Sequence, residues 1–101
     1  MRDPESSMEL LRKALDLHRA GRMDEAETNL RRAIVLAPTA PNYHFALGMV
    51  LKVKGDCSGA MAAFHRELEL NPGHLAAAKQ VEEIQRQCVR KWQPASFQVS
   101  V

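Results

Sequence analysis

The sequence predicts an all-α protein built from five antiparallel helices. Three observations support this prediction. Apolar residues recur three and four positions apart through most of the 101 residues, which is the spacing of one face of an α-helix. Glycines and prolines interrupt this pattern between segments of helical length. The pattern also repeats with a period of 34 residues, as from Leu17 to Leu51.

The repeat aligns small residues with small ones and large residues with large ones. Small side chains fall where two helix backbones touch, large ones fall where the space between helices must be filled, and a proline follows each second helix. The chain therefore contains two similar helical hairpins. The matching pairs are Ala14/Gly48, Leu17/Leu51, Gly21/Gly55, Ala26/Ala60, Leu30/Phe64, Ile34/Leu68 and Pro38/Pro72.

Capping and breaking residues set the limits of the first hairpin. Ser6 or Ser7 can cap a first helix that begins near residue 7, and Gly21 ends it because glycine readily takes the left-handed conformation. Asp24 can cap the second helix or stabilise its start by charge. The second helix then stops before Pro38.

The second hairpin is delimited in the same way. Pro41 suits the first turn of a third helix, which runs to about residue 54 and is closed by Gly55. A fourth helix is expected at 57–70, with Phe64 among its core anchors, and Pro72 breaks the chain after it.

A fifth helix is expected at 75–92. One stripe of it is apolar and the rest is polar, as a stack of hairpins needs at its end, so we interpret it as a lid on the second hairpin. The tail at 93–101 alternates apolar and polar residues like a short strand. Its apolar side chains and Trp92 need a covering surface, either the groove of the same molecule or a second copy of the chain in a homodimer.

The 34-residue unit resembles the tetratricopeptide (TPR) repeat family. This resemblance implies a right-handed α–α superhelix, with a polar leader at 1–6, a TPR-like domain at 7–92 and an extended tail at 93–101. The domain would consist of repeats at 7–40 and 41–74 and the capping helix. The second copy departs from the family pattern at His44, where an aromatic residue is frequent, and at Glu67, where a small residue is expected. Both departures predict weaker local packing.

Composition excludes several classes of function. A net charge of +2 lacks the basic excess of a dedicated nucleic-acid binder. No apolar run has the length of a membrane span, and the first residues lack the apolar core of a signal peptide, so we expect no membrane association and a soluble, cytoplasmic protein.

The cysteines and histidines show no spacing typical of a reactive site. Cys57 and Cys88 form neither a CxxC motif nor a zinc-binding pattern, and we expect two free, partly buried thiols. The histidines are spread over four segments, which favours structural or surface roles. We therefore expect no metal, no cofactor and no enzymatic activity. The histidines are His18, His44, His65 and His74.

The TPR resemblance implies that the first helices of successive hairpins line a concave surface that holds a peptide or a partner helix. On this chain the floor of that surface is apolar, at Leu11, Leu15, Phe45 and Met49. Basic residues, namely Arg12, Arg19 and Lys52, would tune its charge. The full set expected on the surface is Met8, Leu11, Arg12, Leu15, His18, Arg19, Asn42, Phe45, Ala46, Met49, Lys52, Val53, Lys79, Gln80, Glu83 and Arg86.

The resemblance therefore predicts a protein-interaction module or adaptor. Its alternative is an N-terminal scaffold or recruitment domain of a larger enzyme, such as an oxygenase or a sulfotransferase, that continues beyond Val101. One subgroup of the family clamps the C-terminal carboxylate of chaperones with lysine, asparagine and arginine. Here those places hold Leu15, Ala46, Ala76 and Gln80, so the charge-assisted partners of a carboxylate are missing and this ligand is rejected.

Overall fold

The computed structural model describes residues 6–92 of the chain, and the side chains of residues 6–88. Five α-helices make up this part: α1 (Ser7–Arg19), α2 (Met23–Leu36), α3 (Tyr43–Lys54), α4 (Cys57–Leu70) and α5 (Leu75–Trp92). The described residues contain no β-strand, so the all-α prediction is confirmed. The expected strand-like tail at 93–101 and the side chain of Trp92 lie outside the described part.

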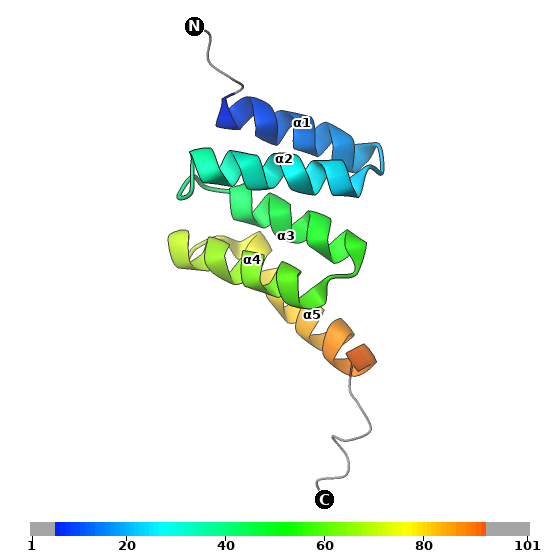
Figure 1. Ribbon diagram of the computed structural model, residues 1–101. Helices are drawn as coiled ribbons and strands as arrows, with labels where there is room; N and C mark the ends of the chain where they lie inside the picture. Colours follow the sequence, from blue (N-terminus) through cyan, green and yellow to red (C-terminus); the bar gives the residue numbers. More distant parts are fainter. Residues whose placement is uncertain (1–5, 93–101) are drawn as a thin grey trace, which may run out of the picture.

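The helices are stacked in chain order, with α1 at one end and α5 at the other (Figure 1). α1 packs on α2 and α3 packs on α4 to form two hairpins, while α2–α3 and α4–α5 contacts join the successive units. α1 also touches α3, and the Tyr43 hydroxyl donates to Ser7 Oγ at 3.2 Å. This arrangement is compatible with the superhelix that the sequence predicts.

Phe64 fills the seam of the second hairpin and is fully buried. A Cβ atom at Gly48 would lie 2.6 Å from the Phe64 ring, far inside van der Waals contact, so only glycine allows α3 to approach the ring so closely. Ala14, Ala26 and Ala60 are equally inaccessible at the other places where helix backbones meet. The repeat register therefore assigns the right residues to the core.

The helix ends follow the expected signals, with two exceptions. Ser6 forms a capping box with Glu9 at the start of α1, and Gly55 ends α3 at φ 87°, in the left-handed region. However, α2 begins without a side-chain cap, because its N-cap position holds Arg22, and Asp24 lies inside the helix, where it pairs with Lys54 of α3. α3 begins at Tyr43, two positions after Pro41, since Asn42 adopts a left-handed conformation at φ 76°.

Glu67 does not weaken the packing of the second hairpin, as the sequence suggested, but completes it. Its carboxylate is fully buried, and its oxygens accept the backbone N–H groups of Asn42 at 2.9 Å and Phe45 at 3.1 Å. These N–H groups belong to the first turn of α3, which has no cap of its own. A residue from the last turn of α4 thus caps α3, and the negative charge suits the positive end of the helix dipole.

His74 extends this network to α5. Its Nδ1 accepts the backbone N–H of Ala77 at 3.1 Å, so Nε2 carries the proton and donates to Asn42 Oδ1 at 2.7 Å. The imidazole ring also contacts Phe45, with ring centroids 4.7 Å apart. One turn residue therefore joins the starts of α3 and α5.

The prediction of two free thiols is wrong, because Cys57 and Cys88 form a disulfide. α4 and α5 run antiparallel, which brings the first residue of α4 beside the fourth turn of α5, with the two Cα atoms 6.3 Å apart. Disulfides persist in oxidising compartments and are reduced in the cytosol. The cytoplasmic location stays a prediction, and it requires a reduced pair there.

An ion-pair cluster crosses from α2 to α3. Lys54 Nζ lies 2.6 Å from both Asp24 and Glu27, and Glu27 also binds Arg31 Nε at 2.8 Å. The hydrogen bond from Lys54, followed by that from Arg31, lowers the pKa of Glu27 below its ordinary value. The carboxylates of Asp24 and Glu27 in turn raise the pKa of Lys54. Both pKa shifts favour the charged forms of Glu27 and Lys54.

We expect the substitution Phe64→Ala to lower the free energy of unfolding by about 3–5 kcal/mol, because it removes a buried ring. Gly48→Ala should cost about 1–3 kcal/mol by overpacking the same seam. Since the ring causes the clash, Phe64→Leu should relieve part of the cost of Gly48→Ala in a double-mutant cycle measured by urea unfolding. Additive effects would show that Gly48 and Phe64 do not meet.

Replacing Glu67 by alanine should cost about 1–3 kcal/mol, because the part-buried N–H groups of Asn42 and Phe45 lose their acceptor. Amide hydrogen exchange at Asn42 and Phe45 should speed up more than in the rest of α3. Glu69→Ala is the matched control, because Glu69 is exposed and pairs only with Arg66 among the described residues; it should change stability by less than about 0.5 kcal/mol. Equal effects of the two substitutions would contradict the capping role.

Reducing the disulfide should lower the free energy of unfolding by about 3–4 kcal/mol, as expected for a cross-link that closes a loop of this length. The measurement is urea unfolding with and without a phosphine reductant. The Cys57→Ser/Cys88→Ser variant should match the reduced protein and should not respond to the reductant. Two titratable thiols in the native, unreduced protein would refute the pairing.

Candidate functional site: the α1–α3–α5 face

The candidate site is the side of the stack to which α1, α3 and α5 contribute, here called the α1–α3–α5 face. α1 lies against α3. Lys52 of α3 reaches α5, where its Nζ donates to Gln80 Oε1 at 2.7 Å and to Glu83 Oε1 at 3.3 Å. α2 and α4 pack on the opposite side of these helices, so the odd-numbered helices present a common surface.

The structure divides the predicted apolar floor into exposed and half-buried residues. Leu15 is 42% exposed, whereas Leu11, Phe45 and Met49 are half-buried and pack against the core. Phe45 is held by two ring contacts. Its ring centroid lies 5.6 Å from that of Phe64 and 4.7 Å from that of His74. The floor that a ligand could reach is therefore smaller than the sequence suggested.

Two further apolar residues of the predicted set widen the accessible surface. Met8 of α1 is 65% exposed and Val53 at the end of α3 is 57% exposed. Together with Leu15 they leave large apolar side chains in water on the same face. Isolated exposed apolar residues are ordinary in folded proteins, but several on one face indicate a contact surface.

The basic residues of the predicted site differ in how freely they can act. Arg19 Nη1 lies 3.0 Å from Asp16 on the same helix, and Lys52 is occupied by Gln80 and Glu83 of α5. Arg12 is exposed and has no ion-pair partner among the described residues. Arg12 is thus the cation best placed to meet a ligand, while Lys52 mainly fixes α5 against α3.

The histidines make structural contacts or lie far from one another, and they do not form a common site. His44 Nε2 donates to the Pro38 carbonyl at 3.1 Å, and His65 is exposed, as the sequence predicted. His18 Nε2 is buried and makes no hydrogen bond with the described residues. Within residues 6–88, no three His, Cys, Asp or Glu side chains are grouped so that they could hold a metal ion.

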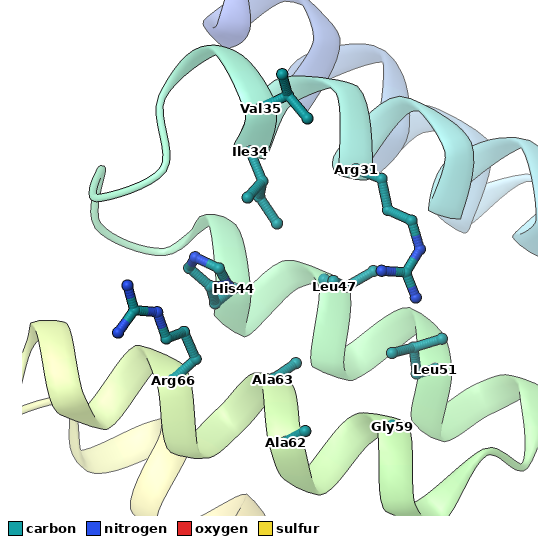
Figure 2. Close-up of a pocket in the computed structure, with 10 residues that line it drawn as sticks. All are labelled: Arg31, Ile34, Val35, His44, Leu47, Leu51, Gly59, Ala62, Ala63 and Arg66. Atoms are coloured by element: carbon teal, nitrogen blue, oxygen red, sulfur yellow. The ribbon is translucent and has the colours of Figure 1, made fainter.

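A second surface feature was missed by sequence reasoning. A groove of about 520 Å³ lies on the opposite side of the stack, between α2 and α4, with α3 as its floor (Figure 2). We call it the α2–α4 groove. The only sign of this groove in the sequence is the row of small residues in α4. Small residues are also expected where two helices pack closely, so the row did not indicate a groove. The lining residues are Arg31, Ile34, Val35, His44, Leu47, Leu51, Gly59, Ala62, Ala63 and Arg66.

Comparison with protein-family models gives no match, and no curated protein matches the chain significantly. None of the helices in the described range combines the length and the apolar composition needed to cross a membrane. Function must therefore be argued from the geometry of the two surfaces.

Proposed function

We propose that the chain is a protein-interaction module that binds a peptide or a partner helix on the α1–α3–α5 face. The observation that carries this proposal is the presence of exposed apolar side chains on that face, at Met8, Leu15 and Val53, beside the half-buried Leu11 and Met49. A ligand that covers them would gain roughly 25 cal/mol for each Å² of apolar surface removed from water.

The rigidity of this face supports a role in binding. Phe45 is fixed by two aromatic contacts, and Lys52 ties α3 to α5. A surface that is already ordered loses little conformational entropy when it binds, which favours affinity. Methionines at Met8 and Met49 add adaptable side chains to this ordered frame.

The ligand that fits best is apolar with some acidic residues. Arg12 on α1 gives one edge of the face an exposed positive charge, whereas Arg19 is paired with Asp16. Charge complementarity at such an edge raises the association rate and the specificity more than the affinity. The resemblance of the 34-residue sequence repeat to the TPR family supports a peptide ligand, because TPR repeats bind peptides on the surface lined by the first helices of their hairpins.

The proposal is tested with peptides selected from a random display library against the wild-type chain. The double substitution Leu15→Glu/Val53→Glu should weaken their binding by more than about tenfold, since both side chains lie in the proposed contact. These positions are more suitable than Phe45, whose replacement would also disturb the core. His65→Glu is the control: His65 is exposed on α4 and belongs to neither the α1–α3–α5 face nor the α2–α4 groove, so affinity should not change.

Fluorescence anisotropy gives the affinities, and circular dichroism confirms that each variant remains folded. If the selected peptides bind the Leu15→Glu/Val53→Glu variant as tightly as the wild type, the α1–α3–α5 face is not the binding surface. An equal loss with His65→Glu would lead to the same conclusion.

A further inference from the structure

The α2–α4 groove exists because α4 presents small residues to it. Gly59, Ala62 and Ala63 form its α4 wall, and none of them reaches across to α2 (Figure 2). The floor is made by Leu47 and Leu51 of α3, which are only 6% and 3% exposed. The groove therefore opens directly onto the hydrophobic core.

The rim of the groove exposes apolar surface to water. Val35 of α2, which lines the groove, is 78% exposed. Ile34 lies beside it in the wall and is half-buried. The groove therefore has a continuous apolar surface, which runs from Val35 and Ile34 of α2 to Leu47 and Leu51 of α3.

The charged residues that line the groove are all basic. Arg31 of α2 and Arg66 of α4 project over it from opposite walls, with His44 near Arg66 at one end (Figure 2). The lining contains no aspartate or glutamate. Arg31 bonds to Glu27 through Nε, and Arg66 bonds to Glu69 through Nη1. Both guanidinium groups retain further N–H donors without a partner in the described part of the chain.

From this combination we propose that the α2–α4 groove is a second docking site, for an amphipathic helix with acidic residues from a partner protein. The apolar face of such a helix would lie on Leu47 and Leu51, as in other helix-in-groove complexes. The small α4 residues let its backbone come close. Its carboxylates would meet Arg31 and Arg66, whose planar guanidinium groups suit paired contacts with carboxylate oxygens.

Charge also selects between this occupant and a second copy of the chain. In a symmetric dimer through the groove, the same patch of both copies meets, so the arginines of one copy would face those of the other. Like charges brought together at an interface oppose association. An acidic partner helix avoids this repulsion, so it is favoured over a homodimer that forms through the groove.

The test is a selection from a display library of amphipathic helices of the length of α2, with varied apolar anchors and equal numbers of Glu and Lys codons at the polar positions. The target is the Leu15→Glu/Val53→Glu variant, so that binding to the α1–α3–α5 face is suppressed and failure of one proposal does not imply failure of the other. We expect selected helices to be rich in Glu and their affinity to fall with added salt.

Two variants then locate the binding. Arg31→Glu/Arg66→Glu should weaken it by at least about tenfold, and Ala62→Phe, which fills the groove at an exposed position without changing charge, should do the same. Lys13→Glu/Arg22→Glu makes the same charge change at exposed positions outside both surfaces and should leave the affinity unchanged. Methyl NMR shifts should be largest at Ile34, Val35, Leu47 and Leu51.

The proposal is overturned if no helix is selected, or if the selected helices are not acidic. It also fails if they bind the groove variants as tightly as the parent, or if the methyl shifts lie on α1 and α5. Circular dichroism of every variant ensures that a loss of binding is not a loss of folding.

Discussion

The buried carboxylate of Glu67 is the contact on which the second half of the structure depends. α3 begins after a left-handed residue and has no cap of its own, so its first N–H groups would be unsatisfied beside the core. Glu67 of α4 accepts hydrogen bonds from these N–H groups. The side chain of Asn42 in turn accepts a hydrogen bond from His74, which stands directly before α5. Three helices therefore share one polar network. Its cost of desolvation is offset because every carboxylate oxygen has a partner.

The helices could be predicted from the sequence because their signals are local. Spacing, glycines and prolines give the helix bounds to within about two residues. Long-range polar contacts could not be predicted in this way. Glu67 departs from the repeat, and nothing near it in sequence indicates that it faces the start of α3. The disulfide did leave a signal: the midpoint between Cys57 and Cys88 falls on the turn at Pro72 and Gly73, so antiparallel helices bring them together.

The candidate site was predictable at the level of the face but not of the single side chain. The repeat assigns Leu15 and Phe45 to the same side of the stack, yet one is exposed and the other is held by Phe64 and His74. That difference depends on side chains that follow later in the chain, from α4 and from the turn before α5. The α2–α4 groove escapes sequence reading for another reason, since it is formed where side chains are small. A sequence shows which residues are present, but the space they leave appears only in three dimensions.

The disulfide also has a mechanical consequence. It joins two residues that are 31 positions apart and so removes the intervening segment from any extension of the chain. Under a force that separates the two ends, the α1–α2 hairpin can unravel completely, but α4 and α5 remain inside a covalent loop. The oxidised chain would therefore stretch about 100 Å less than the reduced one, at about 3.3–3.6 Å for each residue. Tension on an oxidised protein would thus open the first hairpin, and with it the α2 wall of the α2–α4 groove, while the disulfide keeps α4 tied to α5.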